Sequence, residues 1–290
     1  MASPKPIIAP PIPTVRDAAA LDAVLKPWRE AGETIALVPT MGAIHDGHLA
    51  LVRAARSRAD HMVASLFVNP AQFVAGEDLE SYPGDEAADA GALAAAGVEL
   101  LFAPGVAEMY PAGFATTVEV SGLTEGLCGV HRPGHFAGVA TVVAKLLNQC
   151  RPDFACFGEK DYQQLLVVKR LVRDLHIGVE IVAVPTVRAA DGLALSSRNS
   201  YLTDTQRLIA PALYRTLSET AARLADGAGI AGEIDRATAA LLDAGFDSVD
   251  YVALCDAETL EPLTEFARPA RLLAAVHLGP ARLIDNLAVG

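Results

Sequence analysis

The stretch Val38-Pro39-Thr40-Met41-Gly42-Ala43-Ile44-His45-Asp46-Gly47-His48 decides the fold of this chain. The apolar run at 34–38 predicts a buried strand, and the pattern that starts at Leu49 predicts a helix directly after the turn. In an open α/β sheet, ligands bind at such a junction, beside the carboxyl end of the strand. The free N–H groups of a helix's first turn favour an anion there, and His45 and His48 can both face one bound group. We therefore interpret the stretch as a phosphate-binding turn.

Two other interpretations of the histidine pair stay open from this stretch alone. His45 and His48 are spaced as half of a zinc site, although no Cys/His pair at ligand spacing accompanies them. They are also suited to cap the helix as polar residues without any chemistry. We favour phosphate binding because the turn, the helix entry and the paired donors all agree with it.

Composition narrows the classes of function. The chain has 290 residues, of which 52% are hydrophobic, so it can bury a sizeable core as one large or two modest domains. Its formal net charge of −12 argues against a nucleic-acid partner. The four cysteines form no C-x-x-C pair, which is typical of reduced thiols in a cytosolic protein. No apolar stretch is long enough to span a bilayer, so we expect a cytoplasmic protein without a membrane partner.

Apolar periodicity predicts alternating strands and helices up to residue 187. We expect strands at 34–38, 61–68, 98–103, 153–157 and 179–187, and helices at 15–30, 85–96, 136–149 and 162–176. This alternation predicts an α/β fold with a doubly wound parallel sheet, whose carboxyl ends share one edge. We also expect a short strand at 116–120, a mobile loop at 126–138 and a flexible, proline-rich arm at 1–14.

The pattern changes after Leu202. We expect helices at 204–226 and 231–244, and short strands at 249–254, 271–276 and 281–283. These elements predict a smaller α+β unit, so we divide the chain into a ligand-binding domain at 1–187 and a C-terminal domain at 188–290. The C-terminal part shows no dense group of polar residues, and we expect it to close over the site as a lid.

Polar side chains follow other predicted strands. Asn69 and Gln72 come after the strand at 61–68, where amides can fix a polar ligand. Lys160 follows the strand at 153–157, where an ammonium can hold developing phosphate charge. Gln164 lies on the same side as Lys160 by its i,i+4 spacing.

Two further segments carry cationic and hydroxyl groups. Ser196-Ser197-Arg198 predicts a phosphate-binding loop, and the glycine-rich loop at 126–138 carries His131, Arg132 and His135. The shared edge of a parallel sheet would bring all of these groups together, which makes each weak motif more informative.

In order along the chain, these motifs resemble the pantothenate synthetase (pantoate–β-alanine ligase) family. The segment 45–48 looks like the HIGH signature of the nucleotidyltransferase superfamily, and Ser196-Ser197-Arg198 looks like a variant of its KMSKS-type loop. The segments that match the family are 39–48, 67–73, 135–139, 157–164, 184–188 and 196–199. The resemblance covers about residues 33–285 and implies a Rossmann-like, nucleotidyltransferase-type domain.

The resemblance also implies a two-step reaction. The carboxylate of (R)-pantoate attacks the α-phosphate of ATP, with Mg²⁺, and gives pantoyl adenylate and pyrophosphate. The amine of β-alanine then attacks the acyl carbon, which releases pantothenate and AMP. A homodimer is expected from the resemblance alone.

Residue roles are carried over by motif match. Those implied as catalytic are His45, His48, Lys160, Ser196, Ser197 and Arg198, with His48 as the residue that the family labels proton donor. Those implied to bind ATP are Pro39, Thr40, Met41, Gly42, Ala43, Ile44, His45, Asp46, Gly47, His48, Gly158, Glu159, Lys160, Asp161, Val187, Leu195, Ser196, Ser197 and Arg198. Those expected to bind the other substrates are Gln72, Gln164, Asn69, His135, Arg132 and Tyr82.

The chain departs from the family pattern at a few positions. Leu195 stands where the family usually has Met, and Gly84-Asp85 stands where it commonly has Arg-Thr. Ala88-Asp89 leaves one carboxylate where relatives carry an acidic pair, which makes Asp89 the candidate Mg²⁺ contact. Three rival functions are another nucleotidyltransferase, an aminoacyl-tRNA synthetase fragment, which the acidic charge disfavours, and a non-catalytic nucleotide-binding regulator.

Overall fold

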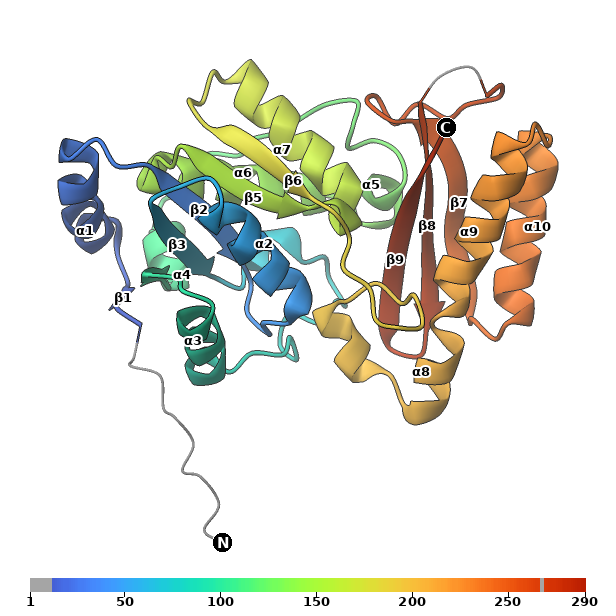
Figure 1. Ribbon diagram of the computed structural model, residues 1–290, viewed down its shortest axis with the longest axis horizontal. Coiled ribbons are helices and arrows are strands. Elements are labelled where there is room, and N and C mark those ends of the chain that lie inside the picture. Colours follow the sequence, from blue (N-terminus) through green and yellow to red (C-terminus); the bar gives the residue numbers. More distant parts are fainter. Residues whose placement is uncertain (1–11, 267–268) are drawn as a thin grey trace, which may run out of the picture.

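The structure is a computed structural model that describes residues 12–266 and 269–290. Its larger part is a six-stranded sheet in the order β1-β4-β3-β2-β5-β6, in which every neighbouring pair is parallel (Figure 1). The strands are β1 (Thr14–Val15), β2 (Ile35–Thr40), β3 (His61–Leu66), β4 (Leu100–Phe102), β5 (Phe154–Gly158) and β6 (Glu180–Val184).

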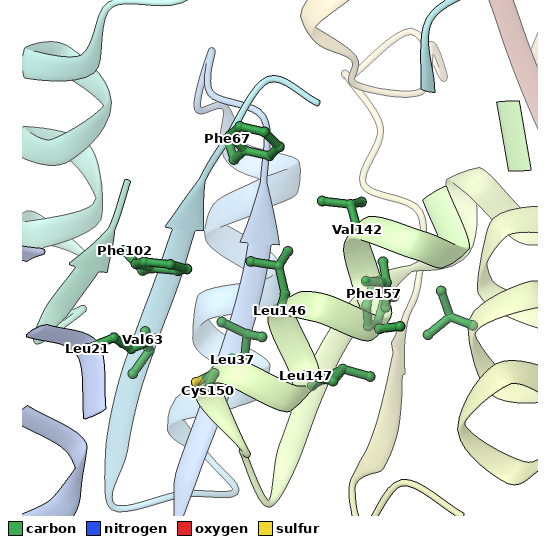
Figure 2. Packing of buried hydrophobic residues seen from close by; sticks show 14 of the residues in the cluster. Leu21, Leu37, Val63, Phe67, Phe102, Val142, Leu146, Leu147, Cys150 and Phe157 are labelled. Atoms are coloured by element: carbon green, nitrogen blue, oxygen red, sulfur yellow. The ribbon is translucent and has the colours of Figure 1, made fainter. Parts of the chain in front are cut away.

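Helices cover both faces of this sheet because each central strand is apolar on both sides. In β2, Ile35 and Leu37 pack into the core under α1 (Ala18–Glu30), α6 (His135–Cys150) and α7 (Tyr162–Asp174) (Figure 2). Ala36 and Val38 of the same strand face the opposite core under α2 (Asp46–Arg56) and α3 (Glu86–Ala95). This two-sided burial is what a parallel sheet in a doubly wound fold requires, and the predicted fold class is confirmed.

A second sheet contains three antiparallel strands in the order β7-β8-β9. Its strands are β7 (Ser248–Asp256), β8 (Ala270–Leu278) and β9 (Ala281–Val289). The helices α9 (Ala212–Ala225) and α10 (Ile230–Asp243) pack on it and close a separate apolar core. Figure 1 shows β9 on the side that faces the larger sheet. The division of the chain at residue 187 stays a proposal.

Several predicted elements were wrong in detail. No strand forms at 116–120, and the predicted loop at 126–138 contains α5 (Cys128–His131) and the start of α6. The predicted helix at 204–226 is split into α8 (Asp204–Ile209) and α9, because Pro211 lacks the N–H that a continuous helix needs.

The N-terminal prediction also needs correction. Residues 1–11 of the expected arm lie outside the described part of the chain, but Thr14 belongs to β1 and pairs with Leu101. Among the described residues, no helix is long and apolar enough to cross a bilayer. The remaining short elements are α4 (Val106–Met109) and three 3-10 helices, η1 (Pro70–Gln72), η2 (Glu159–Asp161) and η3 (Ser197–Tyr201).

Helix α6 approaches the segment after β3 too closely for any side chain. A Cβ atom placed on Gly138 would lie 2.1 Å from the carbonyl oxygen of Ala71 in η1. The same glycine's carbonyl oxygen accepts a hydrogen bond of 3.1 Å from Nδ2 of Asn69. The position of η1, and with it that of Gln72, therefore depends on a glycine in the first turn of α6.

We expect Gly138→Ala to lower the free energy of unfolding by about 3 kcal/mol, because the backbone of η1 must move to make room. The matched control is Gly91→Ala in α3, where nothing lies within 4 Å of the added Cβ. That change should raise the free energy of unfolding by about 1 kcal/mol through helix propensity. Urea unfolding measures both, and shifts in the same direction would contradict the packing argument.

Candidate functional site

A cavity of about 230 Å³ opens at the carboxyl ends of the parallel strands. The parallel sheet brings the carboxyl ends of β2, β3, β5 and β6 together there, which is where a doubly wound fold binds ligands. The predicted site residues that line it are Pro39, Thr40, Met41, His45, Gly47, His48, Asn69, Gln72, Tyr82, Arg132, His135, Gly158, Lys160, Asp161, Gln164, Val187, Leu195, Ser196, Ser197 and Arg198. Segments that are far apart in sequence thus meet in one place.

Six predicted residues do not line this cavity, namely Gly42, Ala43, Ile44, Asp46, Glu159 and Asp89. Gly42, Ala43 and Ile44 belong to the turn between β2 and α2, and Asp89 of α3 holds that turn by hydrogen bonds. One carboxylate oxygen of Asp89 accepts from Ala43 N at 2.9 Å and the other from Ile44 N at 2.7 Å. Gly42 has φ +91°, and a Cβ there would lie 2.9 Å from the Asp89 carboxylate.

Asp89 does not fit the role of a magnesium ligand. The residue is only 5% exposed, and both of its carboxylate oxygens already accept backbone hydrogen bonds. Within 12–266 and 269–290, no group of three or more His, Cys, Asp or Glu residues could hold a metal ion. The structural role of Asp89 is instead to fix the turn that enters α2.

The histidine pair caps α2, and this capping determines which ring nitrogen carries hydrogen. Nδ1 of His45 accepts from Gly47 N at 3.1 Å, and Nδ1 of His48 accepts from His45 N at 3.3 Å. In a neutral imidazole, an acceptor Nδ1 leaves the hydrogen on Nε2. The cap interpretation and the ligand-donor interpretation are therefore compatible. Gly47 is required because a Cβ there would lie 2.7 Å from Cε1 of His45.

Both imidazoles are held neutral. Burial, followed by the charge of the neighbouring His45, lowers the pKa of His48 to about 3. Burial also lowers the pKa of His45, with Lys160 as the next cause. The ring centroids are 4.1 Å apart. The pair therefore offers two Nε2–H donors to a ligand at neutral pH without adding a positive charge.

The amide of Asn69 positions Gln72. Asn69 is 1% exposed, and its Nδ2 donates to Oε1 of Gln72 at 3.0 Å as well as to Gly138. Its Oδ1 accepts from Ala71 N at 3.2 Å and from the hydroxyl of Tyr110 at 2.7 Å. Protein groups thus use the whole amide of Asn69, while Nε2 of Gln72 lies 2.9 Å from Sδ of Met41. Tyr110 was not among the predicted site residues.

A chain of hydrogen bonds through Arg132 and His135 holds the backbone of Gln72. Nε2 of His135 is 3.0 Å from Nη1 of Arg132, which can only donate, so Nδ1–H of His135 donates to the carbonyl of Gln72 at 2.7 Å. Burial and the Arg132 charge lower the pKa of His135 to about 4. Arg132 in turn donates to both oxygens of Glu77, at 2.5 and 2.8 Å. Glu77 was not predicted for the site.

The cationic side of the cavity is formed by η2 and η3. Nζ of Lys160 lies 3.7 Å from Oδ1 of Asp161. Nη2 of Arg198 donates to Oδ1 of Asp78 at 2.8 Å, and the carboxyl of Asp78 was likewise not predicted for the site. Oγ of Ser197 lies 3.1 Å from the hydroxyl of Tyr82. Hydroxyls and cations thus line the same cavity as the histidine pair.

The C-terminal sheet carries more polar groups than we predicted. A second cavity of about 810 Å³ lies between it and the first site, and Lys160, Asp161, Ser196 and Arg198 line both. Its far wall includes Asp250, His277, Arg282 and Asp285. No dense polar group was apparent from the sequence of the C-terminal part, because these residues are spread over β7, β8 and β9 and form no contiguous motif.

The site can therefore bind a ligand that combines anionic phosphates with a small polar acid. Neutral N–H donors, cations, hydroxyls and the amides of Gln72 and Gln164 all line the one cavity. Such preorganised donors are suited to charge that moves between phosphate oxygens.

Comparisons with known proteins show the family of the chain. A family model described as Pantoate-beta-alanine ligase matches residues 13–288. The pantothenate synthetase of Paramagnetospirillum magneticum is 59% identical, over 95% of this chain and 97% of that protein. The pantothenate synthetase of Sphingopyxis alaskensis is 56% identical, over 95% of this chain and 99% of that protein.

Solved structures give the same result. A pantothenate synthetase from Thermus thermophilus is similar with a TM-score of 0.90 and 51% identity, and the match covers 95% of this chain and 99% of that one. A pantoate-beta-alanine ligase from Francisella tularensis, complexed with beta-gamma ATP and beta-alanine, has a TM-score of 0.81 and 33% identity, with 95% and 97% covered. From the matched model and these relatives, the chain belongs to the pantoate-beta-alanine ligase family.

Proposed function

We propose that this protein condenses (R)-pantoate with β-alanine to pantothenate through pantoyl adenylate, converting ATP to AMP and pyrophosphate. One observation carries the proposal: a single cavity joins the neutral histidine pair and Lys160 to the amides of Gln72 and Gln164. Family membership gives the same reaction, and the related ligase from Francisella tularensis is complexed with a form of ATP and with β-alanine.

In the first step, a carboxylate oxygen of pantoate attacks the α-phosphorus, and the bond from that phosphorus to the bridging oxygen of pyrophosphate breaks. Negative charge grows on the leaving pyrophosphate. We assign its stabilisation to the ammonium of Lys160 and to Ser196, Ser197 and Arg198. His45 and His48 donate Nε2–H hydrogen bonds to the phosphates, so His48 acts as a neutral donor. Gln72 and Gln164 hold the pantoate.

In the second step, the neutral amine of β-alanine attacks the acyl carbon, the amide bond forms, and the bond to the AMP oxygen breaks. The amine loses one proton on the way to the amide. Water would hydrolyse the adenylate, so the site must exclude it. We propose that the C-terminal part, at 188–290, closes over the cavity for this purpose.

Mg²⁺ enters this proposal with the ATP. Since Asp89 is engaged with the backbone, we propose that the phosphates and water hold the ion, a mode that Mg²⁺ often adopts in nucleotide sites. ATP contacts at Gly158, Asp161 and the backbone of Val187 are part of the proposal. A homodimer remains an expectation from the family resemblance, and a cytoplasmic location remains an expectation from the sequence.

Exchange of labelled pyrophosphate into ATP tests the function directly. We expect exchange that requires pantoate and proceeds without β-alanine, because the first step is reversible while the adenylate stays bound. Adding β-alanine should then produce pantothenate and AMP in equal amounts. A folded, ATP-binding protein that shows no pantoate-dependent exchange would overturn the proposal, and exchange with another acid would point to a different ligase.

Lys160→Ala should lower the exchange rate by about 10²–10³-fold, because it removes a donor aimed at charge that develops in the transition state. Lys169→Ala, an exposed lysine on the neighbouring helix α7, is the matched control and should leave the rate unchanged. ATP affinity measured by calorimetry separates binding from chemistry. A Lys160→Ala enzyme with a normal rate would exclude this lysine from the transition state.

The neutral state of His48 can be tested through stability. Between pH 6.5 and about 3, the unfolded chain binds a proton that the folded His48 does not, so wild-type stability falls as the pH falls. His48→Gln removes this dependence while it keeps an N–H donor. We therefore compare the free energies of unfolding of the variant and the wild type. As the pH falls from 6 to 4.5, the value of the variant minus that of wild type should rise by about 1.4 kcal/mol per pH unit. Parallel stability curves would show that His48 is protonated in the folded state.

A further inference from the structure

The turn that carries Lys160 is held by a residue of the C-terminal sheet. Nδ2 of Asn286, on β9, donates one hydrogen bond to the carbonyl of Glu159 and one to the carbonyl of Lys160, both at 2.9 Å. Oδ1 of Asn286 accepts from Nε of Arg271 at 2.6 Å. The residue is 3% exposed. Both polar atoms of this buried amide are therefore hydrogen-bonded, and two of the three hydrogen bonds go to backbone carbonyls of η2.

Arg271, on β8, also contacts the residues around Lys160. Its Nη2 lies 3.2 Å from Oε2 of Glu159, and its guanidinium lies 4.0 Å from the ring centroid of Tyr162, the first residue of α7. The hydroxyl of Tyr162 donates to the carbonyl of Ala257 at 2.8 Å. The C-terminal part thus contacts Glu159 and Tyr162, on the two sides of Lys160 along the chain.

The neighbouring residue on β9 holds the other phosphate-facing segment. Both oxygens of Asp285 accept from Arg188, at 2.6 and 2.9 Å, and one of them also accepts from Asn286 N at 2.8 Å. Arg188 begins the hairpin that returns to Ser196, where Leu195 N donates to the carbonyl of Val187. Two adjacent side chains therefore join η2 to the segment that leads into η3.

We propose that Asn286 is a positioning residue, which sets the backbone of Lys160 so that its ammonium meets the departing pyrophosphate. The inference rests on the proposed function, in which Lys160 acts in adenylate formation. A displacement of about 1 Å at a catalytic group can cost about 10²-fold in rate. The two hydrogen bonds of Asn286 fix the carbonyl oxygens on both sides of the Cα of Lys160.

Asn286→Asp tests the inference at nearly constant size. The carboxylate still accepts from Arg271, but it cannot donate to the two carbonyls. We expect the pantoate-dependent exchange rate at saturating substrates to fall 10- to 100-fold, with the affinity for ATP changed less than 3-fold. The control is Asn148→Asp on the exposed side of α6, which adds the same charge and should leave the rate unchanged.

A double-mutant cycle separates positioning from a general structural effect. If Asn286 acts through Lys160, Asn286→Asp should change the residual rate of Lys160→Ala by less than 2-fold, because the group being positioned is absent. Equal losses in both backgrounds, or a folded Asn286→Asp enzyme with a normal rate, would overturn the inference. If Asn286→Asp melts below the assay temperature, Asn286→Ala takes its place with the same expectations.

The wild-type assay keeps this test distinct from that of the function. Wild-type enzyme without pantoate-dependent exchange would refute the proposed function before any variant is made. Wild-type exchange together with an additive cycle would keep the function and refute only the positioning role of Asn286.

Discussion

Backbone groups that strands and helices leave unpaired must find partners, and this requirement shapes the whole site. The ends of parallel strands and the starts of the following helices meet at one edge, so free N–H and C=O groups are concentrated there. His45 and Asp89 satisfy N–H groups around the entry to α2, while His135 and Asn286 satisfy carbonyls of the two other turns. The side chains that would meet substrates are therefore held by the same bonds that complete the backbone.

This arrangement also sets the charge of the cavity. Capping engages Nδ1 of both histidines and burial keeps the rings neutral, so they contribute donors without charge. The guanidinium groups of Arg132 and Arg198 each bond a carboxylate of the segment after η1. The family's two steps need first a site for leaving pyrophosphate and then a site for an incoming amine. A cavity with neutral donors and balanced cations suits both.

The sequence was sufficient to predict every strand of the larger sheet except the two-residue β1. It also predicted most of the residues that line the cavity, because those residues form contiguous motifs at strand ends. His45, Lys160 and Ser197 could be found in this way. Sequence could not reveal what supports them. Tyr110 and Asn286 act through contacts between elements that only the folded chain brings together, and isolated polar residues on strands give no local pattern. The hydrogen bonds of Asp89 were hidden for the same reason, since its partners lie in a turn 45 and 46 residues earlier.

The pairing of the cavity's cations with carboxylates affects the rate at which ATP associates with the protein. Lys160, Arg132 and Arg198 each face a carboxylate, in Asp161, Glu77 and Asp78, and the chain as a whole has a net charge of −12. Because these charges are compensated, we expect little long-range electrostatic steering of ATP toward the cavity. Added salt screens the repulsion between an acidic protein and an acidic nucleotide. Association should therefore become faster as ionic strength rises, the reverse of the behaviour of an enzyme with an open basic cleft.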